Sequence, residues 1–185
     1  MIIIQDMSIA EANSLVAQWH RHNDPVPPIQ ARFAVGLIEY FPATKVSNPL
    51  GTAIIGNPCG RPNDQGIVEL RRVAFKPGEV FHKLRRWYPS DDNKPAKDAL
   101  TLRRIPIITR TNDVLEHAIE PGFKVPSYFM KMVERLVKRR MPDKHTIWTY
   151  IREGEKGEYL DHAGYVREHH FTRGGVPKTR LARAV

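Results

Sequence analysis

The spacing of apolar residues divides the first part of the chain into one helix and several strands. Ile2–Gln5 predicts a first strand, and the capping box Ser8–Glu11 opens a helix whose apolar residues recur at helical spacing. This helix is expected to end near His22 and Asn23, before a proline-rich break. Short links between the next three apolar runs favour an antiparallel meander. These runs span Arg32 to Tyr40, Leu50 to Gly56 and Ile67 to Phe75.

Residues 76–125 interrupt this alternation with frequent proline, glycine, aspartate and asparagine, and we interpret them as an inserted flap. Within the flap, Ile105–Thr111 is expected to form a strand and Asn112–Ile119 a short helix. Pro126 then suits the first turn of an amphipathic helix that Pro142 ends.

The stretch from Thr146 to Tyr165 has the most informative pattern in the chain. A β-rich run gives way to a polar turn and then to a short helix. Gly164 supplies the left-handed residue that stops this helix. A final strand is expected to run to about Phe171.

Length and charge limit the classes of protein to consider. The 185 residues, 41% of them hydrophobic, fit one domain over residues 1–171, followed by a loose basic tail over 172–185. Lys and Arg number 29 against 20 acids, a net charge of +9, so DNA is a natural partner. The single cysteine, Cys59, excludes an internal disulfide and a cysteine-based zinc cage. We expect a cytoplasmic protein without a membrane partner, because no apolar run approaches a membrane span.

The order strand, turn, short helix, glycine and aromatic residue resembles the C-terminal half of the GNAT acyltransferase fold. That fold is an α/β architecture with a mixed, mostly antiparallel central sheet flanked by helices. Five blocks in the right order resemble more closely the phage Mom-type proteins and their GNAT-like bacterial and prophage relatives. The blocks read WHRHNDPVPP, RFAVGL, GTAIIGNPCGR, VELRRV, and the Ser127 helix with TYIREGEKGEYLDHAGY. The resemblance covers nearly all of the chain except the insertion and the tail.

Mom-type proteins convert adenine in duplex DNA to an N6-carbamoylmethyl derivative, which protects phage DNA from restriction. The resemblance therefore implies a DNA-modifying transferase, working in the host cytoplasm if a phage encodes it. The alternative is a GNAT-type N-acetyltransferase that acts on a protein or a tRNA-linked substrate. The oligomeric state stays open, with a homodimer as one option.

One departure from the GNAT pattern concerns the donor. GNAT enzymes hold the pyrophosphate of acetyl-CoA in a glycine-rich loop before the central helix, whereas residues 123–128 read FKVPSY here. Bulky side chains keep backbone amides away from a pyrophosphate, so the sequence argues against acetyl-CoA and leaves a glycyl donor, another acyl donor or a metal ion open. Ser127, where the Mom-type branch also has a serine, and Tyr128 are the candidate cofactor-binding residues. Plain helix capping is the other interpretation of Ser127.

Two histidines and a strand carboxylate are the first catalytic candidates. His20 and His22 lie at the end of the first helix, where resembling proteins carry a histidine pair; contact with helix carbonyls is the alternative. Glu69 lies in an apolar and basic strand, where a carboxylate is costly unless it is paired or functional. It is either a general base or the partner of Arg71 or Arg72. The relatives' E-x-x-R pattern, here Glu69 and Arg72, favours the functional interpretation.

Further candidates follow the strand that splays in the GNAT fold to open the donor cleft. They are Tyr150, Glu153 and Glu155, and one of the two carboxylates can orient the adenine amine or a metal. The alternative is that both glutamates are exposed turn residues, which is our interpretation of Glu155. Tyr159 can supply a proton or stack on a base, with ordinary packing as the alternative.

Two basic segments are the candidate DNA-binding surfaces. The run HKLRRWY joins cations that can meet phosphates to aromatic rings that can stack on an extruded base. A flap that packs its own tryptophan is the alternative. The candidate residues are Lys83, Arg85, Arg86, Trp87 and Tyr88 in this run, and Arg173, Lys178 and Arg180 in the tail.

Overall fold

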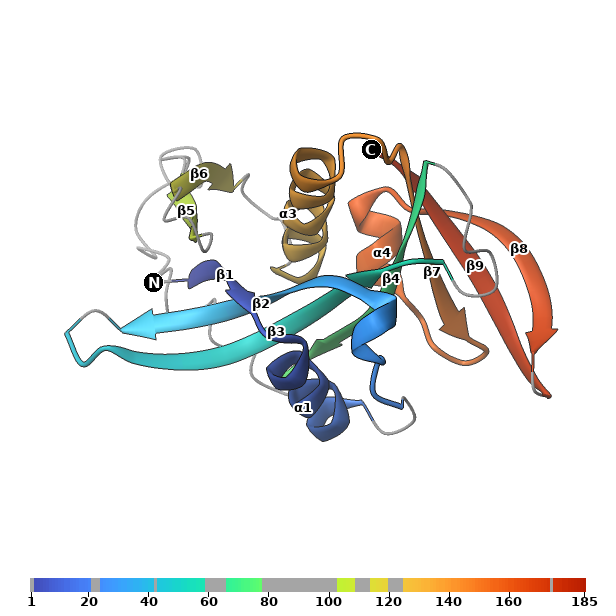
Figure 1. Ribbon diagram of the computed structural model, residues 1–185, viewed down its shortest axis with the longest axis horizontal. Helices are drawn as coiled ribbons and strands as arrows, with labels where there is room; N and C mark the ends of the chain where they lie inside the picture. The colour runs from blue at the N-terminus through green and yellow to red at the C-terminus, as the bar shows by residue number, and fades with distance from the viewer. Residues whose placement is uncertain are drawn as a thin grey trace, which may run out of the picture.

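The computed structural model describes residues 2–20, 24–41, 43–58, 66–77, 103–108, 114–119, 125–173 and 175–185. The strands in these ranges are β1 (Ile2–Met7), β2 (Ala31–Phe41), β3 (Val46–Gly56), β4 (Ile67–Phe75), β5 (Arg103–Ile108), β6 (Val114–Ile119), β7 (Thr146–Arg152), β8 (Val166–Arg173) and β9 (Val176–Ala184). They form one sheet in the order β6-β5-β1-β2-β3-β4-β7-β9-β8 (Figure 1). Only β1 with β5 and β4 with β7 run parallel among the described pairs. The mixed, mostly antiparallel sheet confirms the predicted fold class.

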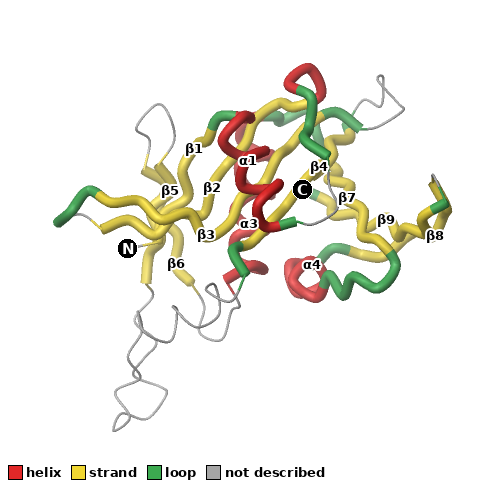
Figure 2. Tube along the Cα trace, turned by 90° about the horizontal axis from the view of Figure 1, so that it is seen from below, coloured by secondary structure: helices red, strands yellow, loops and turns green. Residues whose placement is uncertain are grey.

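Helices cover both faces of this sheet (Figures 1 and 2). The described helices are α1 (Ile9–Trp19), the short 3-10 helix η1 (Pro28–Gln30), α3 (Val125–Arg140) and α4 (Glu158–Ala163). On one face, Ala12 and Val16 of α1 pack against Ala34 and Ile54. On the opposite face, α3 and α4 pack on the main core, where Phe129 of α3 is fully buried. No described helix is long and apolar enough to cross a membrane.

The first helix is shorter than its sequence pattern predicts. The capping box is confirmed, because Glu11 N donates to Ser8 Oγ and Ser8 N donates to Glu11 Oε2. The helix already ends at Trp19, and His20 has an extended backbone. Two hydrogen bonds between the Asn13 side chain and the backbone of Val26, at 2.8 and 2.9 Å, hold the returning chain against the helix. The chain therefore turns back before the predicted end near residues 22 and 23.

The predicted flap contributes a hairpin to the sheet. The strand expected over 105–111 is found as β5, which pairs in parallel with β1. The helix predicted over 112–119 is wrong, because residues 114–119 form β6 and pair with all six residues of β5. Strand pairing has overridden the local helical preference. Most of the predicted flap, including 78–102, lies outside the described residues.

The loose basic tail predicted over 172–185 is also wrong. Residues 176–184 form β9, which lies inside the sheet between β7 and β8. Thr179 and Leu181 are buried, whereas Lys178 and Arg180 alternate with them on the other face. The domain therefore extends past residue 171, and the charged residues of the segment conceal a period-two strand pattern.

Leu181→Ala tests the structural role of β9. The Leu181 side chain is fully buried in the main core, so we expect the free energy of unfolding to fall by about 2–5 kcal/mol. Urea denaturation followed by circular dichroism measures this loss. Ala184→Ser, at an exposed position of the same strand, is the control and should change the stability by less than about 0.5 kcal/mol. Equal midpoints for Leu181→Ala and the parent chain would contradict the assignment.

Candidate active site

The two parallel strands at the centre of the sheet separate soon after they meet. β4 and β7 pair only through Ile67–Glu69 and Thr146–Trp148. Next along β4 is a bulge at Arg71, because Leu70 faces Ile55 while Arg72 faces Ile54. A bulge bends its strand and increases the local twist. The separation opens a cleft of about 450 Å³, as the GNAT resemblance predicts.

The walls of this cleft are strongly basic. Five arginine or lysine side chains line it, against two glutamates. They come from elements far apart in the sequence, including the end of α1 and the strands β8 and β9. Its polar and aromatic lining residues are His20, Glu69, Arg71, Arg72, Thr149, Tyr150, Arg152, Glu155, Tyr159, His169, Phe171, Lys178 and Arg180.

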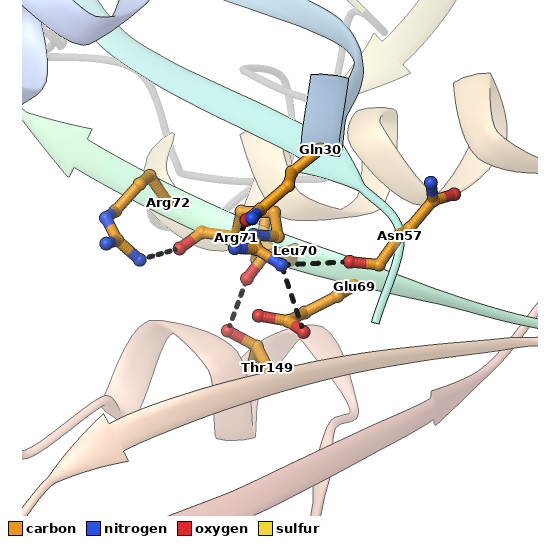
Figure 3. Close-up of polar contacts among 7 residues, drawn as sticks. All are labelled: Gln30, Asn57, Glu69, Leu70, Arg71, Arg72 and Thr149. Atoms are coloured by element: carbon orange, nitrogen blue, oxygen red, sulfur yellow. Dashed lines mark hydrogen bonds and ion pairs between the residues drawn. The ribbon is translucent and has the colours of Figure 1, made fainter. Parts of the chain in front are cut away.

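Glu69 occupies the last position of β4 that pairs with β7, and it is only 4% exposed. Figure 3 shows its carboxylate beside Arg71, whose Nη1 lies 3.8 Å from Glu69 Oε2. Arg71 Nη1 also donates to the carbonyl oxygen of Asn57 at 3.0 Å, and Nη2 donates to Gln30 Oε1. The Arg71 guanidinium therefore compensates the buried carboxylate that lies two residues before it on the same face of the strand. The predicted pairing of Glu69 with an arginine is confirmed, and Glu69 also lines the cleft.

Thr149 links the two strands just past their last pair. Its buried hydroxyl donates to the carbonyl oxygen of Leu70 at 3.1 Å (Figure 3). This bond replaces the ladder hydrogen bond that the diverging backbones no longer make.

Arg72 and His20 form the α1 side of the cleft. Arg72 Nη2 and Nε donate to the backbone oxygen of Asp24 at 3.0 and 3.3 Å, which fastens the segment after α1 to β4. His20 caps α1, its backbone N–H donating to Val16 O, and its side chain lines the cleft. The predicted partner His22 lies outside the described residues.

Tyr159 lines the cleft from α4, on the opposite face of the sheet from α1. Its ring packs edge-on against Phe75, with centroids 5.5 Å apart. Burial, and secondarily the charge of Glu155, raises the pKa of the Tyr159 phenol far above its usual value. The phenol therefore keeps its proton at neutral pH and can donate a hydrogen bond into the cleft.

Three predicted residues lie away from the cleft. Glu153 lies on the exposed turn after β7 and lines a neighbouring hollow, which shares Arg152 and Lys178 with the cleft. Ser127 and Tyr128 lie in the first turn of α3, with side chains 1% and 5% exposed, and neither lines the cleft. Ser127 Oγ has no hydrogen-bond partner among the described residues.

The predicted DNA-binding residues divide between the described and undescribed parts of the chain. Lys178 and Arg180 lie on the cleft wall. Arg173 ends β8, and only its backbone is described. The HKLRRWY run, with Lys83, Arg85, Arg86, Trp87 and Tyr88, lies outside the described residues. Within the described ranges, no group of three or more His, Cys, Asp or Glu side chains could hold a metal ion.

Sequence reasoning missed several residues that the fold brings to the cleft. Arg71 was considered only as a neutralising charge, and Thr149, Arg152, His169 and Phe171 were not considered as site residues. The pair Arg71 and Arg72 gave no signal of the bulge, since a regular strand places successive side chains on opposite faces. The places of Thr149, Arg152, His169 and Phe171 on the cleft wall depend on the pairing between β7, β9 and β8, which the local sequence does not reveal.

Comparisons with known proteins agree on the architecture. No family model and no curated protein sequence matches the chain. Among solved structures, a protein assigned as a phosphinothricin N-acetyltransferase aligns with a TM-score of 0.56 and 10% identity, covering 100% of this chain and 99% of its own. Aminoglycoside acetyltransferase AAC(6')-Ib in complex with coenzyme A aligns at 0.53 and 10%, covering 100% and 95%.

A third structure is the ribosomal-protein-S18-alanine N-acetyltransferase from Escherichia coli. It aligns with a TM-score of 0.51 and 11% identity, covering 100% of this chain and 94% of that protein. Identities this low establish shared architecture rather than shared substrates. The chain has the fold of the GNAT acetyltransferases.

Proposed function

We propose that the chain transfers an acyl group from an activated thioester carrier to an amine, with both reactants meeting in the cleft between β4 and β7. The observation that carries this proposal is the buried carboxylate of Glu69, at the point where the two strands part. The GNAT acetyltransferase fold supports it. An amine on a protein or on a tRNA-linked substrate is an acceptor of the required class.

Glu69 and Tyr159 have separate roles in the proposed reaction. The amine nitrogen forms a bond to the acyl carbon, and the bond from that carbon to the carrier sulfur breaks. Glu69 accepts the proton that the amine loses, directly or through one water, while Tyr159 donates a hydrogen bond to the leaving sulfur, which takes a proton from solvent. Glu69 then returns its proton to solvent. The two groups come from opposite faces of the sheet, so each can serve one reactant.

The diverging strands suit a carrier with an extended, amide-bearing arm. Past Glu69 and Trp148, the facing edges of β4 and β7 form no described pair with each other, so their backbone groups can bind the amides of such an arm. The fold implies coenzyme A, but the first turn of α3 does not fit its diphosphate. Pro126 has no N–H to offer, and the side chains of Pro126–Met130 are all buried.

A second candidate function is modification of the N6 amine of adenine in DNA. The basic cleft wall favours it, with its five arginine or lysine side chains against two glutamates. An enzyme that acts on this amine must bind phosphates and take the base out of the stack. A carbamoylmethyl group would then pass from an activated donor to the N6 nitrogen, as the bond from its carbon to the donor's leaving group breaks. Glu69 would again accept the amine proton, and the leaving group would depart into solvent. Protection of phage DNA from restriction is the biological role that this candidate implies.

Glu69→Gln tests the assignment of the base. We expect the rate of acyl transfer to an amine, measured as thiol released from an acetyl thioester, to fall at least about a hundredfold, because the amide cannot accept the proton. Glu158→Gln is the matched control at an exposed position of α4 and should keep the parent rate. A Glu69→Gln protein that folds normally and retains more than half of the rate would remove Glu69 from the mechanism.

Acetyl-pantetheine and acetyl-CoA should serve as donors with kcat/KM values within about tenfold of each other. A diphosphate held by backbone amides gains about 1.5–3 kcal/mol for each charged hydrogen bond, and the first turn of α3 does not fit one. Parallel thiol-release assays with the two donors measure the ratio. An advantage of more than a hundredfold for acetyl-CoA would show that the chain binds the diphosphate by other means.

Nucleoside analysis separates the two candidate functions. If adenine in DNA is the acceptor, DNA from cells expressing the chain should contain a deoxyadenosine of increased mass, detected by mass spectrometry after enzymatic digestion. Cells expressing Glu69→Gln provide the control and should yield only ordinary nucleosides. If the DNA is unmodified in cells that contain folded parent protein, adenine in DNA is not the acceptor. The amine of a protein or of a tRNA-linked substrate is then the remaining candidate.

A further inference from the structure

The sheet formed by β7, β9 and β8 carries aromatic and cationic side chains on one face. Figures 1 and 2 place α1 away from this end of the sheet, because α1 packs against β2, β3 and β4. The opposite face is buried against α3 and α4 through Ile151 and Leu181. The described helices therefore do not pack on the outer face of these three strands.

The strand register fixes which side chains share this outer face. Tyr150 and His169 both pair with Arg180, Phe171 pairs with Lys178, and Trp148 pairs with Ala182. Directly opposed residues project from the same face of a sheet. We call this set the aromatic platform. It consists of Trp148, Tyr150, His169, Phe171, Lys178 and Arg180.

The rings of the platform form a connected layer. Tyr150 and Phe171 meet edge to face with centroids 5.6 Å apart, and His169 is stacked parallel to Phe171 at 6.0 Å. The Arg180 guanidinium lies over the Trp148 ring, 4.3 Å from its centroid. No ion pair to Lys178 is found among the described residues, so its charge remains available to a ligand.

We infer that the platform binds unpaired nucleotides of a single-stranded nucleic acid segment, with bases stacked on Tyr150 and Phe171 and phosphates beside Lys178. Arg180, whose Nε pairs with Glu168 Oε2 at 3.2 Å, supports the Trp148 ring of the platform. Aromatic rings interleaved with cations are the features that single-strand binding requires, and the net charge of +9 favours a polyanion. A protein partner of opposite charge would match the cations but would not need the layer of rings.

The platform is continuous with the proposed reaction site. All its members except Trp148 line the cleft, and Trp148 pairs with Glu69, which projects from the same face. A base stacked on the platform therefore lies on the side of the sheet that bears the carboxylate. The inference rests on the proposed function only for the fate of that base, since binding itself requires no donor.

Fluorescence anisotropy with a labelled mixed-sequence DNA 12-mer tests the platform in the full-length chain. We expect the single strand to bind at least tenfold more tightly than the same sequence as a duplex. Phe171→Ala should weaken single-strand binding about tenfold, within the range for loss of one stacked base. Phe171→Leu, which keeps an apolar side chain at this position, should weaken it similarly and guards against a folding defect. Lys178→Met should reduce the salt dependence, d log K/d log[salt], by about 0.7.

Matched variants separate this inference from the proposed reaction. Lys138→Met, at an exposed position of α3 away from the platform, should leave binding unchanged. Glu69→Gln should abolish transfer yet keep single-strand binding, so the two proposals can fail independently. Equal affinity for duplex and single strand, no binding to either, or full affinity in both Phe171 variants would overturn the platform assignment.

Discussion

The short pairing between β4 and β7 is the constraint on which the rest of the structure depends. Two parallel strands at the centre of a sheet normally satisfy each other's backbone along their whole length, but these strands pair over three positions only. The bulge at Arg71 turns β4 away from β7. Just beyond the last pair, Thr149 Oγ1 donates a hydrogen bond to Leu70 O and so still links the two strands. Beyond that bond, the facing backbone groups of β4 and β7 must bind water or a ligand. The fold therefore creates a polar cleft in its own core.

Arg71, at the bulge, solves an electrostatic problem that the cleft creates. A carboxylate at Glu69 would be costly in a central strand without compensation. Arg71 lies two residues further along, so its side chain shares the face of Glu69, and its guanidinium also bonds to Gln30 and Asn57. These contacts compensate the candidate base and tie β4 to the segments before β2 and after β3. In a regular strand Arg72 would share the face of Leu70, whereas the bulge sets it opposite Ile54, on the side of Glu69.

Local signals in the sequence predicted the elements that depend on local physics. The capping box, the meander from β2 to β4 and the glycine that ends α4 were correct because each depends on neighbouring residues. The errors arose where long-range pairing decides the structure. β6 was assigned as a helix, and β9 was taken for a loose tail because arginine and lysine dominate its composition. Glu69, Tyr159 and His20, singled out from the sequence, all line the cleft, but the cleft residues on β8 depend on strand neighbours that no local pattern specifies.

Because β9 was predicted as a loose tail, the sequence did not show where its positive charges lie. Lys178 and Arg180 read as a flexible basic arm that could reach a polyanion anywhere. Fixed in β9, they lie across from the rings of β7 and β8 and on the wall of the reaction cleft. A flexible arm contributes attraction without geometry, whereas cations at fixed positions between rings can orient a nucleotide as well as attract it. Because Glu69 projects from the same face, the proposed orientation of the substrate and the proposed removal of its proton would be two properties of one surface rather than of two separate parts of the chain.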